Sequence, residues 1–173
     1  MHRRDLLRFV ASAAATVGAT AVSGPVVSAR IASAEKPMPK HRHGPFIETT
    51  DGTSLFYTDW GGGMPVVFLA AWCLNSSAWD YQTNYLTSKG IRCVAYDRRG
   101  HGRSSRPGDG YDFDTLSDDL AAIIEQLDLQ QVTLVAHSMG AGEAVRYLTR
   151  HGSSRVRRLG PGCANYAVSP EDS

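Results

Sequence analysis

Cysteine is scarce in this chain. The 173 residues contain three, Cys73, Cys93 and Cys163. A disulfide framework needs more cysteines than this, and an even number of them. Cys93 falls in an apolar segment and is expected to be buried, so we expect no bridge between it and Cys73. The fold is therefore not expected to depend on a disulfide.

An excess of charge of either sign is missing too. Lys and Arg total 18 and Asp and Glu total 17, which leaves a net charge of +1 at pH 7. Nucleic-acid binding needs a concentrated basic face, so a nucleic-acid partner is excluded. The cluster of Arg155, Arg157 and Arg158 is expected to be a solvated helix end.

The chain also lacks the patterns that hold metals and nucleotide cofactors. No metal-ligand spacing is present, and we expect no metal. Gly100 and Gly102 only partly match a dinucleotide fingerprint, because Arg106 and Pro107 follow where a helix should open. We therefore expect no nicotinamide or other cofactor.

No apolar run is long and clean enough for a membrane span. The most apolar segment, residues 9–27, is interrupted by Ser, Thr, Gly and Pro, which makes a membrane-anchoring helix the weaker alternative. Arg3 and Arg4 precede this segment, and Ala32-Ser33-Ala34 offers a small-x-small cleavage site. This order resembles a twin-arginine export signal. We expect residues 1–34 to be removed, residues 35–45 to be a linker, and the protein to be periplasmic or secreted.

What the sequence does contain is a sharp change in the spacing of its apolar residues, within residues 132–148. A β-branched apolar run, 132–136, stops at His137-Ser138-Met139-Gly140, and a helical pattern of apolar residues follows. The pattern predicts a strand, a tight corner and a helix. A serine at such a corner is held in a strained conformation with its hydroxyl in front of the sheet, which suits a nucleophile.

This segment resembles the nucleophile elbow of the α/β-hydrolase family, Gly-x-Ser-x-Gly, with Ala136 in place of the first glycine. The loop Asp97-Arg98-Arg99-Gly100-His101-Gly102-Arg103-Ser104-Ser105 is similar to the family's loop after an earlier strand. Between them, Asp112 or Asp114 is expected to cap a helix. Its apolar face would consist of Leu116, Leu120, Ile124 and Leu127.

The other family elements occur in the expected order. They are an opening hairpin at 46–58, a buried strand at 65–70, a short helix closing at 81–86 and a strand at 91–96. The resemblance implies an α/β fold, with the N-terminal portion of a mostly parallel hydrolase sheet, helices on both faces, over residues 46–159. We expect the family pattern to be truncated after the elbow helix, because residues 160–173 are punctuated by Gly and Pro and hold no strand-length apolar run. The elbow strand would then be a sheet edge prone to aggregation.

Within the family, residues 71–80 most resemble the cofactor-free haloperoxidase and perhydrolase branch and its neighbouring esterases. The resemblance implies that Ser138 is the nucleophile and that the backbone N–H groups of Trp72 and Met139 form the oxyanion hole. Ala70-Ala71 stands where the branch has His-Gly, and the methyl group of Ala71 is expected to restrict that turn.

A serine hydrolase of this family also needs an acid and then a histidine after the nucleophile. His151 follows Ser138 but is expected to lie at the far end of the elbow helix. The remaining carboxylates are Glu143 on that helix and Glu171 and Asp172 in the tail, so we find no acid and no base for a triad.

Two functions remain open. The first is a serine hydrolase acting on small esters or related acyl compounds. Peroxide could react with its acyl-enzyme in place of water and give a peracid. The second is a non-catalytic remnant or binding module that keeps the half-fold. Neither the substrate nor the oligomeric state can be read from the sequence.

Overall fold

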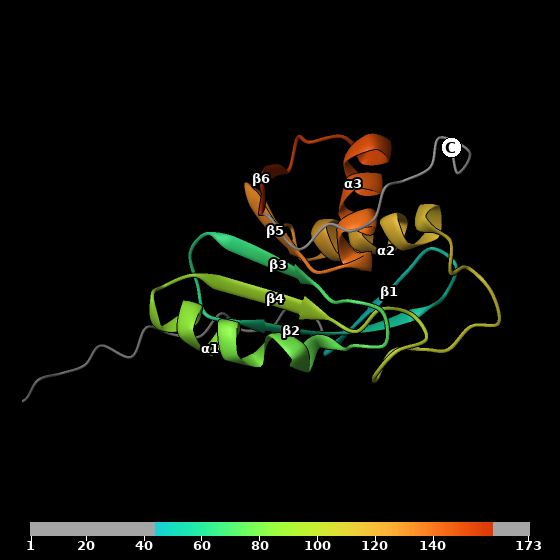
Figure 1. The fold of residues 1–173 in the computed structure, drawn as a ribbon, viewed down its shortest axis with the longest axis horizontal. Helices are drawn as coiled ribbons and strands as arrows, with labels where there is room; N and C mark the ends of the chain where they lie inside the picture. The colour runs from blue at the N-terminus through green and yellow to red at the C-terminus, as the bar shows by residue number, and fades with distance from the viewer. Residues whose placement is uncertain (1–43, 161–173) are drawn as a thin grey trace, which may run out of the picture. The chain divides into compact units, whose positions relative to one another are not determined.

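Residues 44–160 are described by the computed structural model, and they form one six-stranded sheet with helices on both faces (Figure 1). The expected signal at 1–34, most of the linker and residues 161–173 lie outside the described residues. The strands are β1 (Phe46–Glu48), β2 (Ser54–Trp60), β3 (Pro65–Leu69), β4 (Arg92–Tyr96), β5 (Val132–Ala136) and β6 (Val156–Gly160). The helices are the short 3₁₀ helix η1 (Ser76–Trp79), α1 (Asp80–Ser88), α2 (Phe113–Gln126) and α3 (Met139–His151).

The sheet is mostly parallel, as expected. Its strand order is β1-β2-β4-β3-β5-β6, with β2 antiparallel to both β1 and β4 and the other neighbours parallel. The predicted opening hairpin is β1 and β2. The carboxyl ends of β3, β4 and β5 therefore meet at one edge of the sheet, where ligands bind in open α/β sheets.

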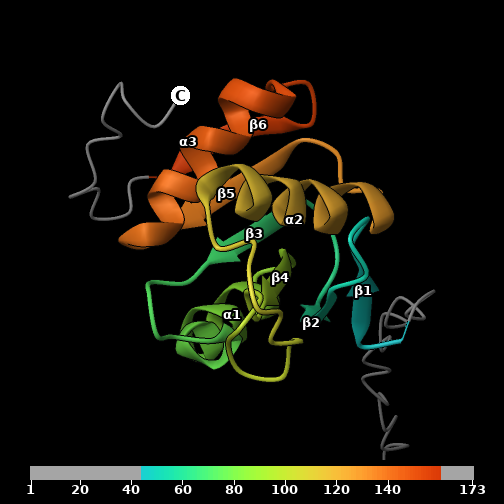
Figure 2. The same cartoon turned by 90° about the vertical axis from the view of Figure 1, so that its right-hand side faces the viewer.

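Helices cover both faces of the sheet (Figure 2). On one face α2 and α3 pack over a large core that includes Val67, Leu134 and Ala144. On the other face Phe68 stacks on Trp79, with ring centroids 4.9 Å apart, beside a smaller core that α1 covers. Burial on both sides explains why β3 is apolar at every position.

Helix α2 begins where the sequence offered two caps. Asp112 is the N-cap, since its side chain accepts the Thr115 N–H at 2.9 Å, whereas Asp114 lies inside the first turn and pairs with Arg146. The predicted apolar face is buried at Leu116, Leu120 and Ile124, with Ile123 beside them and Leu127 partly buried.

The expectation that the elbow strand is a sheet edge is wrong. Residues 156–160 form β6, which pairs in parallel with β5. Arg157 and Arg158 are exposed strand residues of β6, not a helix end. The segment has only two large apolar side chains, Val156 and Leu159, which is too weak a pattern to predict a strand. The strand forms because the backbone of β5 supplies hydrogen-bonding partners.

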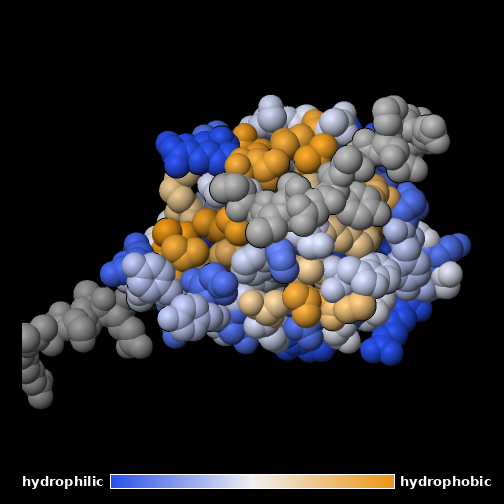
Figure 3. All heavy atoms as spheres, viewed as in Figure 1, coloured by the Kyte–Doolittle hydropathy of each residue, from blue (hydrophilic) through white to orange (hydrophobic). Residues whose placement is uncertain are grey.

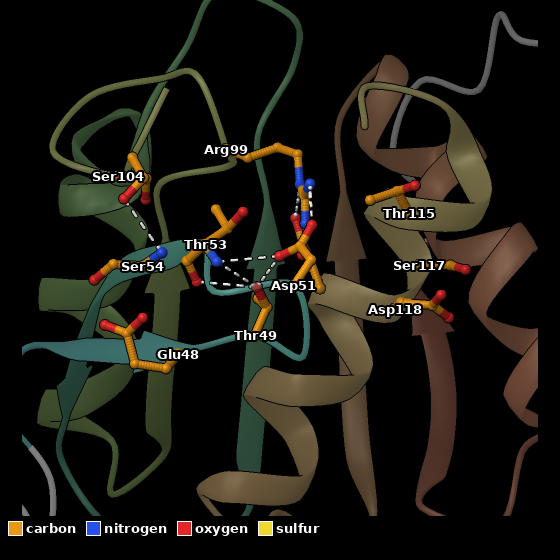
Figure 4. Close-up of polar contacts among 12 residues, drawn as sticks. Glu48, Thr49, Asp51, Thr53, Ser54, Arg99, Ser104, Thr115, Ser117 and Asp118 are labelled. Carbon is orange, nitrogen blue, oxygen red and sulfur yellow. Dashed lines mark hydrogen bonds and ion pairs between the residues drawn. The ribbon is translucent and has the colours of Figure 1, made fainter. Parts of the chain in front are cut away.

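The hairpin turn is clamped to the loop after β4 by Arg99 (Figure 4). Its guanidinium donates to Asp51 at 2.8 Å and, through two nitrogens, to Asp119 of α2 at 2.7 and 2.6 Å. Arg99 holds the pKa of the Asp51 carboxyl well below its usual range. This arginine of the family-like loop therefore joins the hairpin, the loop and α2.

Candidate active site

Ser138 occupies the tight corner between β5 and α3 that the sequence predicts. Its backbone has φ 54° and ψ −120°, a conformation that non-glycine residues rarely adopt. The surrounding structure holds it there, because Ala136 pairs with Leu69 of β3 and the His137 N–H donates to the Leu69 carbonyl at 3.0 Å. The Ser138 side chain makes no capping hydrogen bond.

The first turn of α3 lies directly beneath this corner. Met139 opens the helix, and its N–H donates to no group among the described residues. Free N–H groups and the helix dipole both favour negative charge at this point. The Met139 N–H is therefore available to an oxyanion, as the family resemblance implies.

The second expected donor, Trp72, lies in the loop between β3 and η1, residues 70–75, which we call the oxyanion loop. The Leu74 N–H donates to the Ala71 carbonyl at 3.2 Å, which closes a turn with Trp72 and Cys73 at its centre. The backbone N–H of Trp72 has no partner among residues 44–160, and the residue is 54% exposed. This N–H is thus also free to bind a ligand.

The expected restriction by the Ala71 methyl group is wrong. The residue of the loop with positive φ is Cys73, at 62°, and Ala71 is not among the residues with positive φ. A turn of this kind needs a positive φ at its third residue. The strain that the sequence placed on Ala71 is therefore carried two residues later.

Both ends of the oxyanion loop are held by the loop after β4. At the start, Arg98 Nη2 donates to the Ala70 carbonyl at 2.9 Å. At the end, the Ser76 N–H donates to Asp97 Oδ1 at 2.8 Å. Asp97 Oδ2 accepts the Arg103 N–H at 2.8 Å, so its buried carboxylate joins the two loops.

Glu143, one of the carboxylates after Ser138, is occupied elsewhere. It is fully buried in α3, accepts the Tyr96 hydroxyl and forms an ion pair with Arg98 at 2.6 Å. Burial, and after it the charge of Glu143, raises the pKa of Tyr96 well above its ordinary value. Sequence reasoning found Glu143 but did not predict its partners, Tyr96 and Arg98. The one hint was the presence of Arg98 in the family-like loop.

None of the described histidines is hydrogen-bonded to Ser138. His151 lies at the end of α3, as expected, and its Nε2 is 2.8 Å from Asp118. His137 is exposed beside Ser138. His101 places its Nδ1 3.0 Å from the Arg99 carbonyl and packs edge-on against Trp72, with ring centroids 5.1 Å apart. Sequence reasoning missed this His101–Trp72 contact at the oxyanion loop.

Cys73 is exposed and free in this loop, and Cys93 is buried and free in β4, so the expectation of no bridge between them is confirmed. Burial raises the pKa of the Cys93 thiol to about 11, which keeps it protonated and unreactive. Cys163 lies outside the described residues. Within residues 44–160 no group of His, Cys, Asp and Glu could hold a metal ion, and no helix there has the length and apolarity of a membrane span.

Residues 64–159 match the family described as the alpha/beta hydrolase fold. The chain belongs to the α/β-hydrolase family. It is 54% identical over 113 residues to a non-heme chloroperoxidase of Kitasatospora aureofaciens, an alignment that covers 65% of this chain and 41% of the relative. It is 43% identical over 115 residues to a bifunctional esterase/perhydrolase of Acinetobacter calcoaceticus, covering 65% of this chain and 42% of that α/β-hydrolase.

Solved α/β-hydrolase structures agree. An esterase from Exiguobacterium antarcticum superposes with a TM-score of 0.66 at 44% identity, covering 68% of this chain and 44% of the esterase. The branch suggested by the sequence is therefore confirmed, since its relatives carry haloperoxidase and esterase names. The chain spans about two fifths of the length of these relatives.

Proposed function

We propose that this α/β-hydrolase is a serine hydrolase that acts on small esters or related acyl compounds, with Ser138 as its nucleophile. The observation that carries the proposal is the strained backbone of Ser138, φ 54° and ψ −120°, at the corner between β5 and α3. Strain of this kind persists where the fold over-determines it, and it presents the hydroxyl in front of the sheet.

The chemistry follows from the groups around the corner. Ser138 Oγ attacks the acyl carbon, and the Met139 and Trp72 N–H groups receive the negative charge that develops on the carbonyl oxygen. The C–O bond of the ester breaks, the leaving oxygen takes the serine proton and departs as the alcohol, and an acyl-Ser138 remains. Water then adds to the acyl carbon, which releases the carboxylic acid and returns the proton to the serine.

The haloperoxidase and perhydrolase relatives suggest a second fate for the acyl-serine. Hydrogen peroxide, in place of water, adds to the acyl carbon, and the products are a peracid and free Ser138. This branch of the proposal rests on the names of the Kitasatospora and Acinetobacter relatives. It needs no cofactor.

The chain of 173 residues by itself is proposed to be weakly active or inactive. Ser138 makes no hydrogen bond to a described histidine or carboxylate, and Glu143 and His151 are bound to Arg98 and Asp118. A serine without a base is a poor nucleophile. The same observation favours the second candidate function, a non-catalytic module that keeps the half-fold and binds acyl compounds.

Labelling with a fluorophosphonate tests the proposal. The chain alone should react slowly at Ser138, and supplying the C-terminal portion of a relative, with its acid and histidine, should accelerate labelling and p-nitrophenyl acetate hydrolysis. Ser138→Ala should abolish both, whereas Ser77→Ala, at an exposed serine of η1, should not. Labelling and hydrolysis that persist in Ser138→Ala would refute the nucleophile, and binding without turnover in the completed protein would favour the module.

We also propose that residues 1–34 direct export through a twin-arginine pathway, so that the mature protein is periplasmic or secreted. The support is the order of Arg3 and Arg4, a weakly apolar segment and Ala32-Ser33-Ala34.

A further inference from the structure

We propose that Arg98 is a positioning residue that sets the direction of the Trp72 N–H and fixes it relative to the Met139 N–H. This inference rests on the proposed function, because it concerns the oxyanion hole of the same site. The resemblance of the loop at 97–105 to the family does not by itself give Arg98 a role.

The contacts of Arg98 run to the oxyanion loop and to the elbow helix. Its side chain is 3% exposed, and one nitrogen, Nη2, donates both to the Ala70 carbonyl at 2.9 Å and to Glu143 Oε2 at 2.6 Å. Nε donates to the same Glu143 oxygen at 2.9 Å. Arg98 Nη1 is buried without a partner among the described residues, so these bonds alone orient the guanidinium.

Each end of this bridge lies close to one oxyanion donor. Ala70 precedes Trp72 by two residues, and Glu143 follows Met139 by one helical turn on α3. The Tyr96 hydroxyl donates to the other oxygen of Glu143, which fixes the carboxylate from the carboxyl end of β4. One buried cation therefore holds the loop that carries the first donor against the helix that carries the second.

An ion pair alone would not need the contact with Ala70. A carboxylate and a cation could neutralise each other anywhere in the core, and such pairs are weak evidence for stability. Here Nη2 reaches a backbone carbonyl and the carboxylate at once while Nε holds the same carboxylate oxygen, and a lysine, which ends one bond short of Nη2 and has no Nε donor, does not reproduce this set of bonds. The role that this geometry fits is alignment of the loop.

Two variants of the full chain separate alignment from stability. In Arg98→Lys the positive charge beside Glu143 remains but this set of bonds is lost. In the double variant Arg98→Met/Glu143→Gln both buried charges are removed together, so no unpaired charge is left to unfold the protein. Arg92→Met is the control, because it removes another ion-paired arginine, which is partly buried and pairs with Asp59 at the far end of β4.

The first readout is the backbone N–H resonance of each tryptophan in ¹⁵N-tryptophan-labelled chain. The sequence has only three, Trp60, Trp72 and Trp79, and Trp72→Phe identifies the one of interest. The Trp72 resonance should shift in both Arg98 variants. In Arg92→Met the Trp60 resonance, next to Asp59, should shift and that of Trp72 should not.

The second readout is the rate of Ser138 labelling by the fluorophosphonate, with its saturation analysed to separate binding from reaction. The reaction step should slow in the Arg98 variants with probe binding unchanged, by up to the factor of about 10²–10³ that loss of one oxyanion donor causes. A purely structural loss would instead reduce the fraction of protein that reacts.

An unshifted Trp72 resonance in the folded Arg98 variants overturns the inference, and so does a shifted resonance with an unchanged labelling rate where wild-type Ser138 is labelled. If Trp72 shifts but wild-type Ser138 is not labelled even with the C-terminal portion supplied, the positioning role stands and the proposed nucleophile fails. The two proposals therefore fail separately.

Discussion

Gly140 of α3 lies against the backbone carbonyl of Leu69 at the end of β3. A Cβ atom at position 140 would be 2.7 Å from that oxygen and 3.0 Å from the carbonyl of Ala70, distances that real Cβ atoms do not tolerate without movement. The third near neighbour is the Leu69 Cβ at 2.8 Å, and none of these atoms can move by a side-chain rotation. The close approach of the elbow helix to β3 thus depends on glycine at this position.

Gly140→Ala should therefore destabilise the protein. Overpacking costs about 1–3 kcal/mol, which exceeds the gain of up to about 1 kcal/mol that alanine brings inside a helix. Chemical denaturation measures the change, and Gly108→Ala is the matched control, because no atom lies within 4 Å of its added Cβ. Equal stability of the two variants would contradict the close contact between Gly140 and β3.

Asp112 should make the stability of α2 depend on pH. The Thr115 N–H, foremost, lowers the pKa of this N-cap carboxyl, so the folded state binds its proton more weakly than the unfolded state. Its contribution is complete above the unfolded pKa of about 3.9 and is lost as the pH falls through the lower folded value. Asp112→Ala should cost about 0.5–2 kcal/mol at neutral pH.

Asp112→Asn is the control for that prediction, because asparagine caps about as well as aspartate but does not titrate. Denaturation curves at pH 7 and at acid pH should show a smaller stability difference between the wild type and Asp112→Ala in acid, whereas the difference between Asp112→Asn and Asp112→Ala should stay the same. A difference between the wild type and Asp112→Ala that stays constant across this range would show that the carboxylate charge of Asp112 does not matter.

The edge strand β6 should govern aggregation of the described sheet. Hydrophobic residues reach the surface over β5, β6 and α3 (Figure 3), and Val145 and Leu159 are 41% and 42% exposed. Charged edge residues discourage pairing with another chain. Arg158→Val should therefore raise light scattering at a given concentration, whereas Arg158→Lys should not. A Val variant that scatters no more light than the wild type would rule out edge pairing through β6.

Export should remove residues 1–34. The basic pair, the weak apolar segment and the small-residue site occur in the order that a signal requires. Mass spectrometry of the mature protein should find Glu35 at its N-terminus, and Arg3→Lys/Arg4→Lys should leave the precursor unprocessed. Recovery of intact Met1 on the wild-type protein from the cytoplasm would refute the prediction.

The corner at Ser138, the α2 face and the two-sided burial of β3 were determined by the sequence itself. Each depends on local order: Ser138 stands where the period of apolar residues changes from strand to helix, and Leu116, Leu120 and Ile124 repeat at helical spacing. Such signals are carried by neighbours in the chain, so they can be read without the fold.

Only the tertiary structure decided the relationships between distant segments. β6 forms because β5 supplies hydrogen-bonding partners, although its own sequence is mostly polar. The strained residue of the oxyanion loop is Cys73 and not Ala71, because the loop is tied at Ala70 by Arg98 and at Ser76 by Asp97. Which buried charges form ion pairs depends on which residues the fold brings together, and the order of residues along the chain does not contain that information.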